Sequence, residues 1–260
     1  MDNHNKWAVV TGASSGIGYE IALALAKKGY HILAIARREV ALQKLQSTIV
    51  NLGAECKYLI VDLAVVGAHK TVKDYLISEG IIPNVLVNNA GCGLYGEFMS
   101  QKPSDIEHML MLNVQTLTML TREVGELIPK GGHIMQVAST MCYVPVSQYS
   151  AYAATKSYVH TFGYALQAEL GPDVSVTTLY PGMTETAFFE RSHHQVATWL
   201  KRIMMYKPDY VAHQGVKAML KRKPRVIAGM LNHFLVIFMH LTPDRINRWL
   251  LNTLFRIASR

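Results

Sequence analysis

Short apolar runs recur along the chain and alternate with longer segments in which apolar residues follow a helical spacing. The runs are rich in Val, Ile and Leu and show no polar alternation, a pattern typical of strands buried on both faces of a parallel sheet. We therefore predict six strands, at Trp7–Thr11, His31–Ala36, Lys57–Val61, Asn84–Val87, His133–Ala138 and Val174–Tyr180.

Helical periodicity fills the segments between these strands and predicts helices at Gly16–Lys28, Val40–Leu52, Ala64–Ser78, Ile106–Ile128 and Ala151–Leu170. Repeated strand–helix units need right-handed crossovers. They predict an α/β fold with a Rossmann-type, doubly wound parallel sheet of about seven strands and helices on both faces. With 260 residues and no internal repeat or linker, residues 1–260 are expected to form a single domain.

A long excursion, residues 183–207, separates the sixth strand from a helix that begins near Asp209. Insertions beyond the carboxyl end of a strand cover ligands in folds of this kind, so we expect a substrate lid here. His193 and His194 in the lid either bind a substrate carboxylate or phosphate or form a solvated pair. The apolar lid residues favour a lipid-like, acyl or steroid substrate; they are Met183, Phe188, Phe189, Trp199, Met204 and Met205.

Composition narrows the class of protein. Half of the residues are hydrophobic and 17% are charged, which indicates a globular chain. The cysteines are too scattered for a disulfide framework, so we expect a reducing compartment; they are Cys56, Cys92 and Cys142. No Cys/His cluster has zinc-ligand spacing, so no metal site is expected. Residues 1–6 are polar and lead directly into a strand, so we expect no signal peptide and a cytoplasmic protein.

The net charge of +8 belongs to the C-terminal part of the chain, because residues 217–260 hold nine basic residues and one acidic residue. Residues 226–260 form an apolar and basic extension, in which the apolar stretch Leu231–Leu241 is too short to span a bilayer. The segment Asp244–Ala258 predicts an amphipathic helix. Ile246, Trp249, Leu250, Leu254 and Ile257 lie on its apolar face, and Arg245, Arg248, Asn252 and Arg256 lie on the other.

Three interpretations of this helix remain open. It packs on the body or on a second subunit, it makes peripheral contact with an anionic membrane, or it binds an acidic partner or substrate carrier. No nucleic-acid partner is expected.

The first strand ends in Thr11-Gly12-Ala13-Ser14-Ser15-Gly16-Ile17-Gly18 and passes directly into a helix. Glycines let a backbone turn tightly and approach a pyrophosphate, whose charge then lies at the helix N-terminus. A tight turn without a ligand is the alternative, but the position in the first strand–helix unit favours a dinucleotide. The expected contacts are Gly12, Ser14, Ser15, Gly16, Ile17 and Gly18.

The residues at the end of the second strand indicate which dinucleotide the chain binds. NAD sites place an acidic residue there for the ribose hydroxyls, whereas this chain has Arg37 and Arg38. Two guanidinium groups suit a 2′-phosphate, so we predict NADP(H). A solvated pair at a helix start is the alternative, and Glu39 would serve a ribose if the loop shifted by two residues.

Candidate catalytic groups lie on the helix Ala151–Leu170. Tyr152 and Lys156 are spaced i and i+4 and so share one face. An ammonium near a phenol lowers the pKa of the phenol, which makes the tyrosine a usable acid and base. Ser139 follows the fifth strand, at the sheet edge where such folds bind ligands. A Tyr–Lys pair alone is more often a surface pair.

Together, these features resemble the short-chain dehydrogenase/reductase family over roughly residues 6–190. The shared elements occur in the family's order: T-G-x-x-x-G-x-G at Thr11–Gly18, Asp62-Leu63, Asn88-Asn89-Ala90-Gly91, Asn113, Ser139, Tyr152-x-x-x-Lys156 and Pro181-Gly182-Met183-Thr184-Glu185-Thr186.

The resemblance implies a catalytic tetrad. Tyr152 would donate a proton to a carbonyl oxygen, and Lys156 would hold the nicotinamide ribose and depress the pKa of the tyrosine. Ser139 would polarise the carbonyl, and Asn113 would fix a water that links Lys156 to solvent. The remaining cofactor contacts would be Asp62 and Leu63 at the adenine, Asn89, Ala90 and Gly91 along the adenosine side, and Pro181, Gly182, Thr184 and Thr186 near the carboxamide and pyrophosphate. Family members commonly form homodimers or homotetramers.

Five neighbouring residues stay ambiguous. Tyr143, Tyr149 and Tyr158 lie in the same region, but none has a lysine four residues later. Cys92 and Cys142 adjoin the motifs and either face the substrate or fill small buried spaces.

The function expected from the sequence is an NADP(H)-dependent oxidoreductase that interconverts a carbonyl and an alcohol, in the reductive direction on an apolar substrate. One alternative is a non-catalytic nucleotide-binding scaffold or sensor, but such proteins commonly lose the tyrosine or lysine that this chain keeps. The other is an epimerase or dehydratase for nucleotide sugars, against which the lack of a second substrate domain counts.

Overall fold

The computed structural model describes residues 6–143, 147–188, 192, 198–243, 245–247, 250 and 253. Its centre is a seven-stranded, wholly parallel sheet in the order β3-β2-β1-β4-β5-β6-β7. The strands are β1 (Trp7–Thr11), β2 (His31–Ala36), β3 (Cys56–Ile60), β4 (Pro83–Asn88), β5 (His133–Val137), β6 (Ser175–Tyr180) and β7 (Arg225–Ile227). The strand order reverses between β1 and β4, so the predicted doubly wound fold is confirmed.

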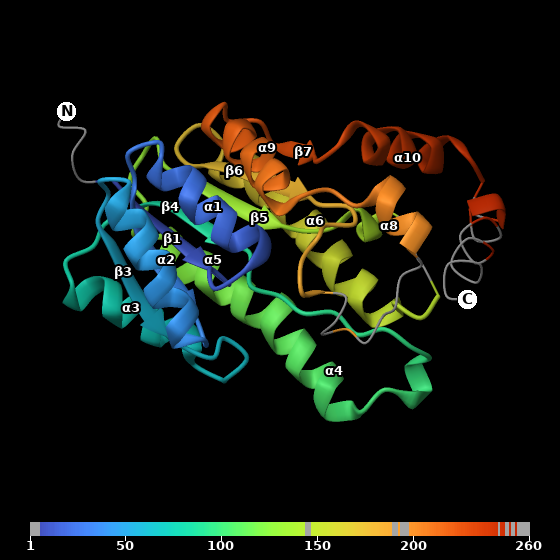
Figure 1. Ribbon diagram of the computed structural model, residues 1–260, viewed down its shortest axis with the longest axis horizontal. Coiled ribbons are helices and arrows are strands. Elements are labelled where there is room, and N and C mark those ends of the chain that lie inside the picture. Colours follow the sequence, from blue (N-terminus) through green and yellow to red (C-terminus); the bar gives the residue numbers. More distant parts are fainter. Residues whose placement is uncertain are drawn as a thin grey trace.

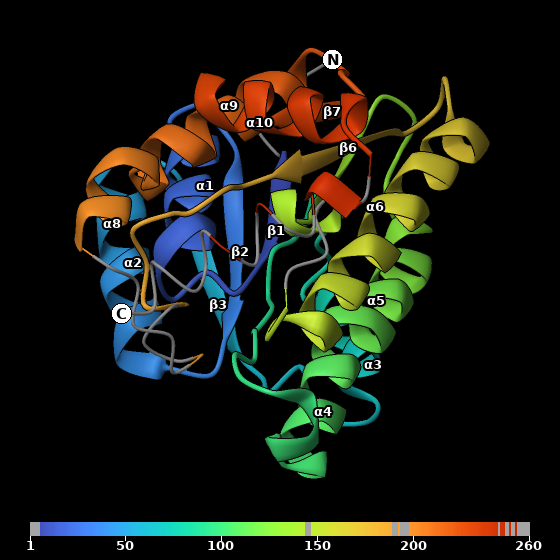
Figure 2. The same ribbon diagram turned by 90° about the vertical axis from the view of Figure 1, so that its right-hand side faces the viewer.

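Helices cover both faces of the sheet (Figures 1 and 2). One face carries α1 (Gly16–Ala26), α2 (Glu39–Asn51) and α9 (Pro208–Leu220). The other carries α3 (Ala68–Ser78), α5 (Leu117–Gly125) and α6 (Ser150–Leu170). Two helices that the sequence analysis did not predict, α8 (Thr198–Met204) and α10 (Met230–Leu241), lie at the right-hand end of the molecule in Figure 1.

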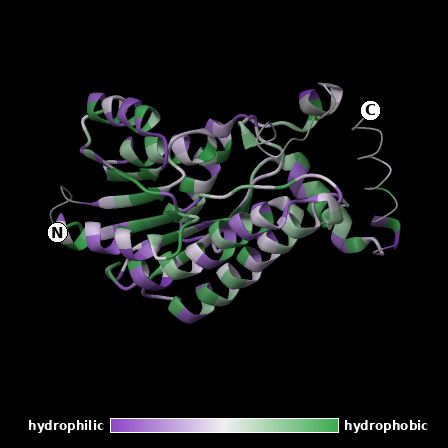
Figure 3. Ribbon diagram, turned by 90° about the horizontal axis from the view of Figure 1, so that it is seen from below, coloured by the Kyte–Doolittle hydropathy of each residue, from purple (hydrophilic) through white to green (hydrophobic). Residues whose placement is uncertain are grey.

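The core has two layers because the central strands β1, β2, β4, β5 and β6 are buried on both sides. Val9, Leu33 and Ile35 face α3 and α5, while their neighbours Ala8 and Val10 face α1 and α2. Hydrophobic residues therefore run along the strands, and they alternate with polar ones on the covering helices (Figure 3). This pattern explains why the strand sequences lack polar alternation.

The single helix predicted at Ile106–Ile128 is wrong. It divides into α4 (Pro103–Leu110), a π-helical segment η2 (Met111–Thr116) and α5. A π turn holds one more residue than an α turn, and such turns occur frequently at functional sites. Asn113 lies within this segment.

The predicted start of the third helix at Ala64 is also wrong, because α3 begins at Ala68. The Asp62 carboxylate accepts a hydrogen bond from the Ala64 amide at 3.0 Å and holds the chain in a turn. Gly67, with φ of +84°, then starts the helix. The turn keeps Asp62 at the carboxyl edge of the sheet, where ligands of doubly wound folds bind.

Candidate active site

Three glycines shape the loop between β1 and α1. Gly12 and Gly16 have φ of +67° and +60°, a region that favours glycine. A Cβ on Gly18 would lie 2.3 Å from Asn89 Nδ2 and 2.6 Å from the Gly12 carbonyl oxygen, so only glycine lets α1 pack this closely. No side chain caps the N-terminus of α1 and its first turn holds no acidic residue, which suits an anion.

Thr11 and Asn89 fasten this loop to the end of β4. The Thr11 hydroxyl donates to the Val87 carbonyl at 3.1 Å and accepts from the amides of Asn89 and Ala90 at 3.0 Å each. The Asn89 side chain donates to the Thr11 carbonyl at 2.9 Å. This loop, residues 11–18, is called the glycine cradle below; these hydrogen bonds hold it in place where the strand order reverses.

The two arginines follow β2 and lie beside the loop between β1 and α1. Arg38 donates to the carbonyl and the hydroxyl oxygen of Ser14, at 3.2 Å each. Arg37 lies 3.5 Å from the Asp62 carboxylate, and Leu63 is buried beside them. Glu39 instead accepts a hydrogen bond from Gln43 one turn along α2. Both guanidinium groups thus border the cavity, and Glu39 does not.

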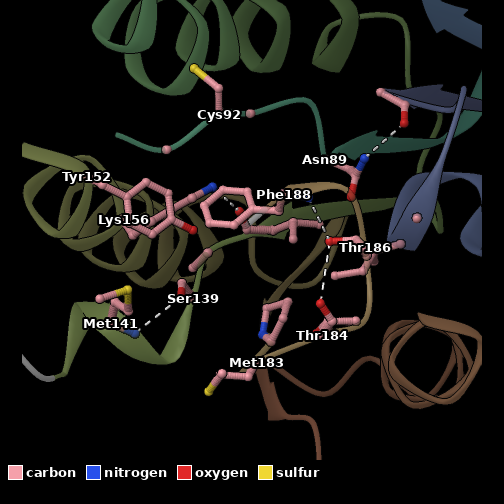
Figure 4. A pocket seen from close by; sticks show the side chains of 18 of the residues that line it. Asn89, Cys92, Ser139, Met141, Tyr152, Lys156, Met183, Thr184, Thr186 and Phe188 are labelled. Atoms are coloured by element: carbon pink, nitrogen blue, oxygen red, sulfur yellow. Dashed lines mark hydrogen bonds between the residues drawn. The ribbon is translucent and has the colours of Figure 1, made fainter. Parts of the chain in front are cut away.

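Tyr152 and Lys156 meet in the buried half of the site (Figure 4). They lie one turn apart on α6, and Lys156 Nζ is 5.8 Å from the centre of the Tyr152 ring. The same ammonium donates to the Val137 carbonyl at 2.9 Å, which fixes α6 against the end of β5. The predicted pair is therefore a buried pair and not a surface pair.

Ser139 reaches the same point from the other side. It caps the short η3 helix (Thr140–Cys142), where its hydroxyl accepts from the Met141 amide at 3.2 Å. That hydroxyl is also hydrogen-bonded to the Tyr152 phenol. Two hydroxyl groups thus converge beside the ammonium of Lys156, an arrangement that can bind a carbonyl oxygen and give it a proton.

Asn113 lies behind these groups and does not line the cavity. Its side chain bonds to the Cys92 amide and carbonyl, at 3.0 and 2.8 Å, and donates to the Thr155 hydroxyl at 3.0 Å. A Cβ on Gly91 would lie 3.1 Å from Asn113 Oδ1 and 3.4 Å from Lys156 Nζ. Asn113 therefore joins three segments around the lysine.

Burial dominates the ionisation of the pair. It lowers the pKa of Lys156 to about 8. It also raises the pKa of Tyr152 above its ordinary value, and the hydrogen bond from Ser139 offsets that only in part. In the protein alone, desolvation disfavours the phenolate more than its neighbours favour it, and the expected lowering of the tyrosine pKa by Lys156 stays a prediction for the cofactor-bound site. Tyr152 holds its proton.

The segment after β6 closes the site. Pro181 accepts a hydrogen bond from the Thr140 amide at 2.9 Å, and the Thr184 hydroxyl donates to the Gly182 carbonyl at 3.0 Å. A Cβ on Gly16 would lie 2.8 Å from the Thr186 side chain, so Thr186 lies against the start of α1. Phe188 packs on Tyr152 with ring centres 5.3 Å apart.

One continuous cavity of about 770 Å³ joins the glycine cradle to Tyr152. Every site residue predicted from the sequence lines it except Gly18, which lies beneath the loop, and Asn113. Cys92 and Tyr149 also line it, whereas Cys142, Tyr143 and Tyr158 do not. Among the apolar lid residues, Met183, Phe188, Trp199 and Met204 line the cavity and Met205 does not. Phe189, His193 and His194 lie outside the described residues.

The sequence analysis missed the contribution of α10 to this cavity. Leu231, Asn232, Leu235 and Val236 form part of its wall. Asn232 is buried against Gly182, where a Cβ would lie 2.3 Å from its side chain. No local signal shows that a segment fifty residues after the motifs returns to the site, since only the course of β7 brings it there.

The family model described as short chain dehydrogenase matches residues 6–197. The chain belongs to the short-chain dehydrogenase family. One relative, the protein of Mycobacterium tuberculosis named "Probable oxidoreductase EphD", is 30% identical over 233 residues and matches 83% of this short-chain dehydrogenase. The match covers 39% of the relative, so the chain spans about two fifths of the length of the first relatives it matches.

A second relative is the fatty acyl-CoA reductase of Acinetobacter baylyi. It is 28% identical over 260 residues, with 97% of this short-chain dehydrogenase and 85% of the relative covered. The alignment with this relative therefore includes nearly all of the C-terminal extension as well as the motifs.

Solved structures show the same fold. A short-chain dehydrogenase from Sphingobium yanoikuyae in complex with NADPH has a TM-score of 0.79 and 24% identity, covering 92% of this chain and 97% of that one. One from Burkholderia phymatum in complex with NAD has a TM-score of 0.82 and 22% identity, covering 95% and 97%. Members of the fold thus bind either dinucleotide, and the choice in this chain has to be argued from its own residues.

Proposed function

We propose that this short-chain dehydrogenase is an NADP(H)-dependent oxidoreductase that reduces the carbonyl group of an apolar substrate to an alcohol. The observation that carries the proposal is the convergence of Ser139, Tyr152 and Lys156 in a buried cavity continuous with the glycine cradle. A binding protein without catalysis would have no use for a protonated phenol and an ammonium held out of water, since burying both lowers stability.

The residues of the cradle fit a dinucleotide. Gly12, Ser14, Ser15, Gly16 and Ile17 line the cavity at the N-terminus of α1, where free amides favour a pyrophosphate. Asp62 and Leu63 would hold the adenine, Asn89 to Gly91 the adenosine side, and Pro181, Gly182, Thr184 and Thr186 the nicotinamide end. Arg37 and Arg38 favour a 2′-phosphate. Glu39 does not line the cavity, and the Asp62 carboxylate that does line it pairs with Arg37. When bound, the nicotinamide would supply a hydride.

The chain's own residues would bind the carbonyl oxygen and supply its proton. The hydroxyl groups of Ser139 and Tyr152 would donate hydrogen bonds to the carbonyl oxygen, and these strengthen as negative charge develops there. Tyr152, whose pKa burial raises, would give up its proton to that oxygen. Lys156 would hold the nicotinamide ribose, and Asn113 would position Lys156 and the Cys92 segment. The family resemblance also implies that Asn113 would fix a water linking Lys156 to solvent.

An apolar substrate suits the walls of the cavity. Met183, Phe188 and Trp199 line one part of it, and Leu231, Leu235 and Val236 of α10 line another. Hydrophobic walls with a few placed polar groups are typical of small-molecule sites. The alignment of nearly the whole chain with a fatty acyl-CoA reductase supports a substrate with an acyl chain. Residues 183–207 would act as the lid of this part of the cavity.

NADPH consumption over a panel of carbonyl compounds tests the proposal. We expect turnover of long-chain aldehydes, long-chain ketones or steroid ketones in preference to short polar ketones, and slower turnover with NADH. The reverse reaction, with alcohols and NADP⁺, is measured in parallel. Absence of turnover throughout the panel in both directions, from folded protein that binds NADPH, would count against the proposal.

Two further properties belong to the same proposal. A cytoplasmic location and a homodimer or homotetramer are the assignments that the family resemblance and the composition support. Within the described residues, no helix is long and apolar enough to cross a membrane, and no cluster of three His, Cys, Asp or Glu side chains suits a metal ion.

A further inference from the structure

Helix α10 presents an apolar face to solvent. Its large exposed side chains are spaced i, i+4, i+7, i+8 and i+11, which places them on one side of the helix. We call this the outer face of α10; it consists of Met230, Phe234, Ile237, Phe238 and Leu241, with exposed fractions between 44% and 79%. A surface helix normally turns such a stripe toward the core, and exposed apolar patches of this kind mark interaction sites.

The opposite side of α10 is already occupied. Asn232, Val236 and Met239 are buried against the body, and the Asn232 side chain donates to the Ala228 carbonyl at 2.6 Å. The His240 ring contacts Tyr143, with ring centres 5.3 Å apart. The helix is therefore anchored through the side that carries Asn232, Val236 and Met239. Rotating α10 to bury the outer face would break these contacts. In Figures 1 and 2 it lies at the edge of the molecule, outside the two helical layers.

The outer face adjoins the substrate cavity. Leu231 is 41% exposed beside this face and also lines the cavity. Trp199 and Ile203 of α8 likewise line the cavity while remaining exposed. A surface held against α10 would thus lie beside one wall of the cavity.

The charge around this region is positive. Arg245, four residues after the end of α10, and Arg202 on α8 are both exposed. Residues 217–260 hold nine basic residues and one acidic residue. A two-fold contact between copies through the outer face would bring these cationic segments together, since a symmetric interface pairs each patch with itself. An anionic surface is the complementary partner.

We propose that the outer face of α10 docks on an anionic lipid surface, so that the cavity takes its apolar substrate from the bilayer. The apolar side chains would enter the headgroup boundary while the cationic groups contact the lipid headgroups. The docking stands on the outer face and the charge; only the route of the substrate rests on the proposed function.

Vesicle co-sedimentation tests the docking in the whole 260-residue chain. We expect it to sediment with phosphatidylcholine vesicles that contain phosphatidylglycerol and much less with phosphatidylcholine alone. The variant Phe234→Ser/Ile237→Ser/Phe238→Ser, none of whose positions lines the cavity, should lose at least about tenfold in partition coefficient. The matched control Val40→Ser/Val66→Ser/Ile77→Ser changes three exposed apolar residues elsewhere and should bind as the unmodified protein does.

Three results would overturn the docking: no sedimentation of the unmodified protein with anionic vesicles, equal sedimentation with neutral ones, or unchanged binding of the α10 variant. A lower oligomeric mass of the α10 variant in analytical ultracentrifugation would also overturn it and assign the face to a second copy. A Phe234→Trp variant adds a direct probe, since vesicles with brominated acyl chains should quench its added emission.

Turnover of a short, water-soluble carbonyl compound keeps the two proposals separate. The α10 variant should reduce it as fast as the unmodified protein, and only the rate with a bilayer-dissolved substrate should fall. Absence of all turnover would count against the proposed function and leave the vesicle result standing.

Discussion

At the scale of single residues, the burial of Lys156 gives the site a pH dependence. Burial lowers the pKa of its ammonium to about 8, so the protein alone loses this positive charge as the pH rises through that value. NADPH is an anion, and its affinity for the ligand-free protein should fall by up to about tenfold per pH unit above it. Fluorescence titration across this range measures the affinity. The variant Lys156→Met should bind more weakly and show little of this dependence; an equal dependence would assign it to another group.

The lowered pKa of Lys156 also makes the free energy of unfolding depend on pH. The folded-state pKa lies below the value of an exposed lysine, so the unfolded chain binds more protons between the two values. Stability should therefore be lowest below the folded-state pKa and should rise as the pH increases from about 8 toward the ordinary pKa of 10.5. In Lys156→Met, urea unfolding should show a flatter profile there and greater stability at neutral pH. An unchanged profile would contradict the assignment.

We expect Arg37 and Arg38 to decide the cofactor preference. Charge-assisted hydrogen bonds to a 2′-phosphate should favour NADPH over NADH by at least about tenfold in affinity. Calorimetry on Arg37→Ala/Arg38→Ala should show this preference lost with little change in the affinity for NADH. The variant Lys44→Ala, which removes a cation from the body of α2, is the control. Equal affinities of the unmodified protein for the two cofactors would reject the assignment.

At the scale of elements, close packing of α6 on β6 positions Tyr152 and Lys156, the proposed catalytic pair. A Cβ on Gly163 would lie 2.3 Å from Thr178 Oγ1, so Gly163→Ala must displace α6 or rotate Thr178. We expect a loss of about 1–3 kcal/mol in unfolding free energy and a lower kcat, because Tyr152 and Lys156 lie on the same helix. Denaturant unfolding and steady-state kinetics measure both.

Gly125→Ala is the matched control for this packing. Its Cβ would meet only Ile134 Cδ1, at an ordinary 3.7 Å, so the change should be neutral or stabilising. The double variant Gly163→Ala/Thr178→Ala should recover part of the loss, with a coupling of at least about 0.5 kcal/mol. Strict additivity would mean that the clash with Thr178 is not the cause.

The local spacing of hydrophobic residues predicted most of the strands and helices, but not the π-helical segment or the late start of α3. Strands such as β1 and β2 are found because burial on both faces leaves a simple apolar run. The π-helical segment at Asn113 was missed because one extra residue in a turn hardly disturbs a helical spacing. The start of α3 was missed because a side-chain bond from Asp62 outcompetes the helix. Both errors fall at the edge of the site.

At the scale of the whole molecule, the motifs could be placed in one site because parallel strands bring their carboxyl ends to one edge. The cradle and Ser139 were predicted at this edge for that reason, whereas Tyr152 and Lys156 were joined to them through the family resemblance; all of them line one cavity. The α10 wall and the raised pKa of Tyr152 could not be predicted, since both depend on long-range packing that no local spacing encodes. The exposed outer face of α10 is likewise a property of the folded chain alone.

The cavity crosses much of the sheet edge, so the cofactor should stabilise the molecule as a unit. At a concentration about 100 times its dissociation constant, NADPH should add about 2.7 kcal/mol to the unfolding free energy, a rise of about 5–10 °C in Tm. Differential scanning fluorimetry measures the shift. Gly18→Ala, whose Cβ would meet the Gly12 carbonyl oxygen at 2.6 Å, should abolish most of it. A shift of equal size in that variant would place the cofactor elsewhere.

The central claim is that Tyr152 delivers the proton. Tyr152→Phe removes one hydroxyl, so Tm and NADPH affinity should stay nearly unchanged, while NADPH consumption with the best substrate of the panel should fall at least about a hundredfold. Tyr158→Phe is the control, because it removes a hydroxyl from the same helix that contacts Thr118 away from the cavity; its turnover should match that of the unmodified protein. If Tyr152→Phe keeps more than about a hundredth of the activity, another group is the acid and the account is wrong.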